Sequence, residues 1–178
     1  MAHIKLKEVE EMSPKIRENL SNFIEKGVDV GDIIKLLAIH EEVFFATDNM
    51  AKKFLLQETE LPYSIKQRIA ILVSLENGCK MCVGVHKALA KTLGMKDEEI
   101  EELSNGIDNL NISDENKKLL KFTVRASKKD NYKIVKEEID EVKALGFTDK
   151  QVLEAVSVSA YFNYINTLSN VFSLGQEA

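Results

Sequence analysis

Helix-breaking residues are scarce in this sequence of 178 residues, which contains eight glycines and two prolines. Typical domains use glycine at about 7% and proline at about 5%, which would give about twelve and about nine here. A β-sandwich or barrel of many short strands needs more turn residues than this chain supplies. No two glycines frame a phosphate-binding loop either. The shortage therefore favours helices joined by few breaks.

Cysteine is also scarce, with two residues in the whole chain, Cys79 and Cys82. Two cysteines cannot hold a chain of this size together as a disulfide scaffold. A bond between residues only three positions apart would close a very small loop and add little stability. Their proximity therefore calls for a chemical explanation.

The sequence lacks both an excess of positive charge and a long apolar run. It has 24 lysines and arginines against 29 aspartates and glutamates, a net charge of -5, and the two signs alternate along the chain. This balance excludes a basic nucleic-acid footprint. The longest strongly apolar run, residues 69–73, is far shorter than the roughly 20 residues that span a bilayer, and the N-terminus lacks a signal-peptide core. We therefore expect a cytoplasmic protein that binds neither nucleic acid nor membrane.

Start and stop signals predict about eight helices and no strand, in one all-α domain over residues 1–178. Ser13 and Pro14 mark the first start, residues 33–56 form one long helical pattern, and Asn77 with Gly78 marks a stop. Further helices are predicted to start at Ser64, Cys79, Asp97, Ser113, Asn131 and Thr148. Glutamine follows two of these starts three residues later, as Gln67 and Gln151, which is the form of a capping box.

A weak internal repeat relates residues 93–100 to residues 145–152. Each copy has a Leu-Gly helix stop followed by a new helix start. Two copies are too few for a solenoid. The pattern indicates a helix hairpin that recurs within a bundle.

One short segment carries the chemistry of this sequence. On a helix, Cys79 and Cys82 are neighbours at i,i+3 and His86 follows Cys82 at i,i+4, so all three share one face. The stop at Gly78 places Cys79 in the first helical turn, where free backbone N–H groups and the helix dipole favour a thiolate. The imidazole of His86 can relay a proton. This arrangement predicts a pair of reactive thiols, of which the helix start favours Cys79 as nucleophile and the histidine favours Cys82.

Two other interpretations of the pair remain open. The cysteines could pack in a core, as free cysteines often do. They could also bind zinc together with His86, with His40 as a fourth ligand, although the chain has no second Cys/His pair. We expect His40 on an apolar face as a core residue. Covalent haem is excluded because Val83, and not histidine, follows the second cysteine.

The segments 61–94 and 144–166 resemble the alkylhydroperoxidase AhpD-like group of the carboxymuconolactone decarboxylase superfamily. The family motif C-x-x-C-x-x-x-His is matched in full by Cys79, Cys82 and His86, and the chain looks closest to the peroxidase-related subset of this length. The resemblance implies an AhpD-like helical bundle with its redox core at about 61–94. It also implies homo-oligomers, either trimers or hexamers built from them, and reduction of hydroperoxides through a redox-active disulfide.

The resemblance also implies roles for single residues. Cys82 resembles the thiol that attacks peroxide, Cys79 the resolving thiol and His86 the relay histidine. The family usually has a glutamate twelve residues before the first cysteine, where this chain has Gln67, which cannot accept a proton. Glu76 is the nearest other carboxylate in the sequence.

These observations predict a thiol-dependent peroxidase with the site residues Cys79, Cys82, His86 and Gln67 and with neither cofactor nor metal. A lipoyl or thioredoxin-like dithiol would re-reduce the cysteine pair. The alternatives are a redox-responsive or thiol-exchange module and a non-enzymatic, metal-binding helical oligomer. In the last helix, Asn163 and Asn166 are expected to form hydrogen bonds to a loop.

Overall fold

The computed structural model describes residues 2–175 and is helical throughout, with ten α-helices, four short 3₁₀ turns and no strand in that range. The all-α prediction is therefore confirmed, with ten helices in place of about eight. The helices are α1 (Pro14–Asn19), α2 (Ser21–Glu25), α3 (Asp32–Leu37), α4 (Glu41–Phe54), α5 (Tyr63–Glu76), α6 (Lys80–Thr92), α7 (Asp97–Glu102), α8 (Asp114–Ser127), α9 (Lys136–Ala144) and α10 (Asp149–Val171).

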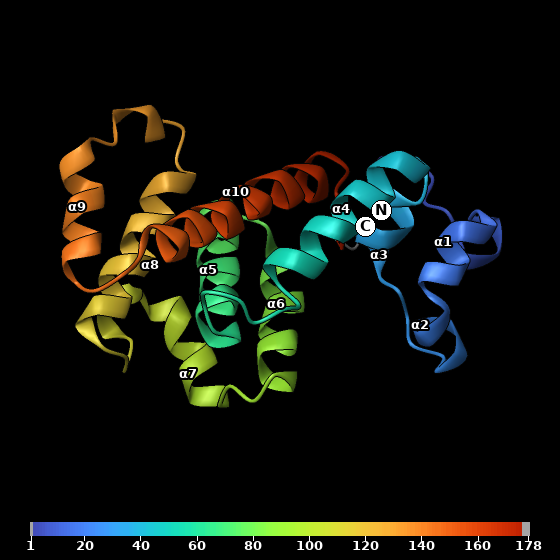
Figure 1. Ribbon diagram of the computed structural model, residues 1–178. Helices are drawn as coiled ribbons and strands as arrows, with labels where there is room; N and C mark the ends of the chain where they lie inside the picture. The colour runs from blue at the N-terminus through green and yellow to red at the C-terminus, as the bar shows by residue number, and fades with distance from the viewer. Residues whose placement is uncertain (1, 176–178) are drawn as a thin grey trace.

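Helix α5 forms the centre of the main core. Ten consecutive residues, 65–74, are buried, so this helix is covered on all sides. It packs against α6, α8 and α10, and Figure 1 shows the long α10 crossing above α5 and α6. The large buried cluster comes mainly from these four helices.

A second, smaller cluster joins the N-terminal helices. It contains Met12, Ile16, Leu20, Leu37, Ala38 and Phe44, with Leu168 of α10 packed against it. Figure 1 places α1 to α4 together at one end of α10. The two ends of the described chain meet there, because the backbone N–H of His3 donates to the carbonyl of Phe172 over 3.0 Å. The single-domain organisation over residues 1–178 stays a prediction.

Local signals set most of the helix ends correctly. Ser13, Ser113 and Thr148 are N-caps whose side chains accept from backbone N–H groups three residues on. Thr148 and Gln151 form the predicted capping box. Both copies of the repeat end a helix at a glycine with positive φ, Gly94 at 92° and Gly146 at 100°.

The prediction of a single long helix over residues 33–56 is wrong. Helix α3 ends at Leu37, and α4 begins at Glu41 after His40, whose backbone is extended. The break allows Leu37 and Phe44 to enter the same N-terminal cluster. His40 is exposed at the N-cap of α4, so its predicted place on an apolar face is also wrong.

Two predicted helix starts are displaced. Helix α5 has Pro62 as its N-cap, and the Glu58 carboxylate accepts from the N–H of Tyr63 over 3.0 Å, so Ser64 and Gln67 form no capping box. A 3₁₀ turn occupies residues 131–133, and α9 begins only at Lys136.

Candidate active site

The turn between α5 and α6 sets the position of the two cysteines. Gly78 adopts a φ of 66°, which a residue with a side chain rarely takes, and this reverses the chain after α5. The N–H of Cys79 then donates to the carbonyl of Ser74 over 2.9 Å. Cys79 is the N-cap of α6, and its Sγ lies 3.4 Å from the backbone nitrogen of Cys82. The predicted stop and restart are therefore confirmed.

Asparagines of α10 hold this turn in place. The side-chain amide of Asn77 donates to Asn163 Oδ1 over 2.8 Å and to Asn166 Oδ1 over 3.0 Å. Asn166 in turn donates to Ser74 Oγ, and Asn170 donates to the carbonyl of Asn77. The expectation that Asn163 and Asn166 form hydrogen bonds to a loop is confirmed. The loop they fix is the one that carries Cys79.

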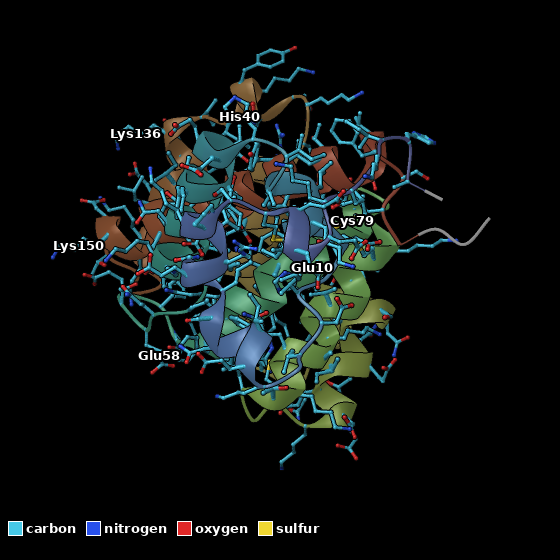
Figure 2. The ribbon with its side chains drawn as sticks, turned by 90° about the vertical axis from the view of Figure 1, so that its right-hand side faces the viewer. Glu10, His40, Glu58, Cys79, Lys136 and Lys150 are labelled. Atoms are coloured by element: carbon cyan, nitrogen blue, oxygen red, sulfur yellow. A yellow bond between two sulfur atoms is a disulfide. The ribbon has the colours of Figure 1, made fainter. Side chains whose placement is uncertain are left out.

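Cys79 and Cys82 are joined by a disulfide, with their Cα atoms 5.4 Å apart. Each is only 2% exposed. In Figure 2, Lys136 and Lys150 project from the edge of the molecule, whereas Cys79 lies among the helices. Both cysteines are thus enclosed by protein.

Ser169 of α10 is a polar neighbour of the disulfide that the sequence analysis missed. Its Oγ lies 3.4 Å from Cys82 Sγ, and both residues are buried. A disulfide sulfur carries no proton, so the hydroxyl is the donor in this state. Ser169 follows Asn166 by three residues, so the two share one face of the helix. A small polar residue interrupting that buried face was the signal in the sequence that could have identified Ser169.

Gln67 and His86 form a second pair. Gln67 Oε1 and His86 Nδ1 are 2.9 Å apart, Gln67 is fully buried, and the His86 ring meets the edge of Phe162 with centroids 4.7 Å apart. Burial lowers the pKa of His86 to about 4, so the ring is neutral at pH 7. Nδ1 then carries the proton and donates to Gln67, which leaves Nε2 as the acceptor. The amide nitrogen of Gln67 has no hydrogen-bond partner among the described residues.

The four predicted site residues are therefore brought together as two pairs. His86 lies one helical turn beyond Cys82 on α6. Within residues 2–175, no hydrogen bond joins His86 to either sulfur. Glu76 is exposed and forms an ion pair with Lys128 over 3.1 Å. The described part of the chain holds no cluster of three or more His, Cys, Asp or Glu side chains suited to a metal ion.

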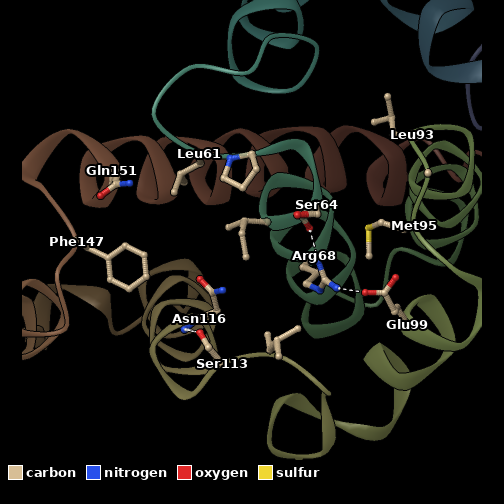
Figure 3. A pocket seen from close by; sticks show the side chains of 14 residues that line it. Leu61, Ser64, Arg68, Leu93, Met95, Glu99, Ser113, Asn116, Phe147 and Gln151 are labelled. Atoms are coloured by element: carbon tan, nitrogen blue, oxygen red, sulfur yellow. Dashed lines mark hydrogen bonds and ion pairs between the residues drawn. The ribbon is translucent and has the colours of Figure 1, made fainter.

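Two of the hollows in the described part of the chain differ in their relation to the predicted site. A small cavity of about 110 Å³ has His86 in its lining. A larger groove of about 540 Å³ is lined by none of the four site residues. Figure 3 shows Arg68 in this groove, where it donates to the Glu99 carboxylate over 3.0 Å and to the Ser64 carbonyl over 3.2 Å.

The fold and part of the sequence match known proteins. Residues 41–109 match the model of the carboxymuconolactone decarboxylase family. The structure is similar to an AhpD-core, peroxidase-related protein from Ralstonia eutropha JMP134, with 19% identity and a TM-score of 0.88 over 99% of this chain and 92% of that one. These findings support the predicted resemblance to the carboxymuconolactone decarboxylase superfamily. Its AhpD-like fold confirms the predicted fold class.

Further solved structures share this AhpD-like fold. A peroxidase-related protein from Silicibacter sp. TM1040 is 20% identical, with a TM-score of 0.88 over 99% of this chain and 92% of that one. A debrominase in complex with 2,3,4-tribromopyrrole is 15% identical, with a TM-score of 0.75 over 100% of this chain and 95% of that one. No curated protein sequence matches the chain significantly. Within residues 2–175, no helix combines the length and apolar character needed to cross a bilayer.

Proposed function

We propose that this AhpD-like protein is a thiol-dependent peroxidase that reduces hydroperoxides through the Cys79–Cys82 pair. The observation that carries the proposal is the buried disulfide at the N-terminus of α6, one turn before a neutral histidine. Backbone N–H groups at a helix N-terminus stabilise a thiolate once the disulfide is reduced. The family match over residues 41–109 supports the same chemistry, as do the similar structures that are named peroxidase-related proteins.

In the proposed cycle, the Cys82 thiolate attacks the terminal oxygen of the hydroperoxide. The S–O bond forms, the O–O bond breaks, and the organic part leaves as an alcohol after taking up one proton. The Cys79 thiol then attacks the Cys82 sulfenic acid, which forms the disulfide and releases water. An external dithiol of the lipoyl or thioredoxin type supplies two electrons and two protons and becomes a disulfide itself.

His86 moves the proton in this proposal. Its Nε2 accepts the thiol proton of Cys82 and returns it to the leaving alkoxide. Gln67 acts as a positioning residue, since its Oε1 keeps the proton on Nδ1 and leaves Nε2 free. We propose that the protein works without a cofactor and in the cytoplasm. We also propose that it forms a homo-oligomer, whose mass light scattering on a sizing column would measure.

The decisive experiment is peroxide consumption by the purified full chain with dihydrolipoamide as electron donor. We expect Cys82→Ser to abolish turnover. Cys79→Ser should permit one turnover and leave a sulfenic acid on Cys82, which a dimedone adduct would locate by mass spectrometry. Equal background rates for the wild type and Cys82→Ser would exclude peroxidase activity.

A second candidate function is favoured by one observation. Gln67 stands where the family usually has a glutamate, and an amide cannot act as a base. A chain without that base would still exchange thiols and act as a redox-responsive module. Thiol titration of air-exposed and reduced protein, followed by transfer of the disulfide to a dithiol, would measure this activity without any peroxide.

A further inference from the structure

The cavity beside His86 lies where the two hydrophobic clusters meet. It has a volume of about 110 Å³. Its walls come from α3, α4, α6 and α10, and are formed by Ile33, Ile34, Leu37, Phe44, Thr47, Asp48, Ala51, His86, Tyr161 and Ile165. Six of these ten side chains are apolar, so the cavity suits an apolar group.

On both α6 and α10, a residue that lines the cavity lies one helical turn from the disulfide or from its contact residue. On α6, the cavity residue His86 follows Cys82 by one turn. On α10, the cavity residue Ile165 precedes Ser169 by one turn, and Ser169 contacts Cys82. One turn of α-helix rises about 5.4 Å. The cavity therefore lies about one helical turn from Cys82, which does not itself line it.

One polar group in the cavity is free to orient a ligand. Burial raises the pKa of Tyr161, so its hydroxyl keeps its proton, and no described residue forms a hydrogen bond with it. The other two polar residues from α4 already have partners. Thr47 Oγ1 is 2.9 Å from the Tyr164 hydroxyl, and Asp48 pairs with Lys52 over 2.7 Å. Tyr161 is thus the available donor for an oxygen of a bound molecule.

We propose that this cavity holds the organic part of a small, branched, apolar hydroperoxide, with the peroxide group directed toward Tyr161 and Cys82. The inference rests on the proposed function and defines its substrate class. An apolar cavity of about 150 Å³ accepts benzene, so one of about 110 Å³ accepts a tert-butyl group and rejects a cumyl group, which carries a phenyl ring in addition. Aryl and fatty-acid hydroperoxides are outside this class.

Binding of the alcohol products tests the cavity without any turnover. Tert-butanol and 2-phenyl-2-propanol are titrated into the oxidised full chain and followed by saturation-transfer NMR. We expect tert-butanol to bind the wild type and Ala46→Leu, which adds the same bulk on the exposed side of α4. Ala51→Leu fills the cavity and should weaken this binding at least tenfold. Binding of both alcohols alike, or tert-butanol binding unchanged in Ala51→Leu, would overturn the proposal.

A turnover experiment separates this inference from the proposed function. In Ala51→Leu, the ratio of kcat/KM for tert-butyl hydroperoxide to kcat/KM for hydrogen peroxide, which has no organic part, should fall at least tenfold, whereas Ala46→Leu should keep the wild-type ratio. An equal loss for both substrates would contradict the cavity assignment. If the protein binds the alcohol as predicted but shows no peroxide turnover, the peroxidase function is excluded and the cavity remains a site for small branched alcohols. If thermal melting shows that Ala51→Leu does not fold, Ile33→Phe fills the same space from α3.

Discussion

The pair formed by Gln67 and His86 distinguishes this site at the scale of single residues. The resemblance to the AhpD-like group implies a carboxylate where Gln67 stands, which could both orient the histidine and accept a proton. The amide performs only the first task, since it fixes the tautomer of a ring whose pKa burial lowers to about 4. In the proposed cycle, His86 would therefore relay a proton with an orienting partner but without a base behind it.

Replacing Gln67 by glutamate should supply the missing base. A carboxylate 2.9 Å from Nδ1 stabilises the imidazolium and should raise the pKa of His86 from about 4 toward its ordinary value. General base catalysis contributes about 10²-fold or more, so we expect Gln67→Glu to increase peroxide turnover at least tenfold. The pH profile of kcat/KM measures both effects. Gln57→Glu, which makes the same change at an exposed position, should behave as the wild type, and an unchanged rate in Gln67→Glu would mean that another group is the base.

Ser169 should tune the reactivity of Cys82. In the reduced protein its hydroxyl, 3.4 Å from Sγ in the disulfide form, can donate to the thiolate. Hydrogen bonds to a charged partner contribute about 1 kcal/mol or more, so Ser169→Ala should slow alkylation of reduced Cys82 by iodoacetamide about fivefold at pH 7. Ser159→Ala removes another buried hydroxyl of α10, one bonded to the Thr123 carbonyl, and should leave the alkylation rate unchanged. A similar slowing in both variants would indicate a general packing effect.

At the scale of elements, the sequence predicted those helix starts and ends that short-range signals control. Asn77, Gly78 and Cys79 are consecutive, and the glycine and the cap act within one turn, so the α5–α6 junction could be predicted. The interruption between α3 and α4 depends on Leu37 and Phe44 meeting in one cluster, and no local residue signals it. The Gln67–His86 pair likewise spans two helices, and the local capping pattern around Ser64 gave the wrong partner.

Helix α5 depends on a buried ion pair at its start. Lys66 is fully buried, lies 2.6 Å from the Glu154 carboxylate, and also donates to the Gln57 carbonyl over 2.6 Å and to Thr59 Oγ1 over 3.1 Å. Glu154 additionally accepts the backbone N–H of Leu61 over 2.9 Å. The pair thus ties the α4–α5 loop to α10.

Removing one partner of this pair should be costly. Lys66→Met leaves the Glu154 carboxylate buried without its cation, so we expect a loss of about 3 kcal/mol in the free energy of unfolding. Lys150→Met removes an exposed pair with Glu60 at 3.6 Å and should cost less than about 1 kcal/mol. Urea denaturation of both variants compares the two values. A loss in Lys66→Met no larger than in Lys150→Met would show that the ion pair does not stabilise the loop.

At the scale of the whole molecule, the cavity exists because two clusters meet without filling the space between them. Composition and helix signals predicted the bundle, but the volume left between α3, α4, α6 and α10 depends on side chains far apart in the sequence. Ile33 and Tyr161, for example, line one cavity although they lie 128 positions apart in the sequence. The motif therefore predicted the residues of the proposed site, and only the assembled fold defines the space for the proposed substrate.

The partly buried His86 should make global stability depend on pH. The pKa of His86 is about 4 in the folded state against an ordinary value of 6.5, so the unfolded chain binds more protons between these values. Stability is therefore lost as pH falls from 6.5 toward 4. The shift corresponds to about 2 kcal/mol, as an upper value, between pH 7 and pH 5. Urea denaturation at both pH values should show this loss in the wild type and in His40→Asn, which changes an exposed histidine. His86→Asn should lower stability at pH 7 but remove most of the pH dependence, and an unaltered pH dependence in that variant would place the titrating group elsewhere.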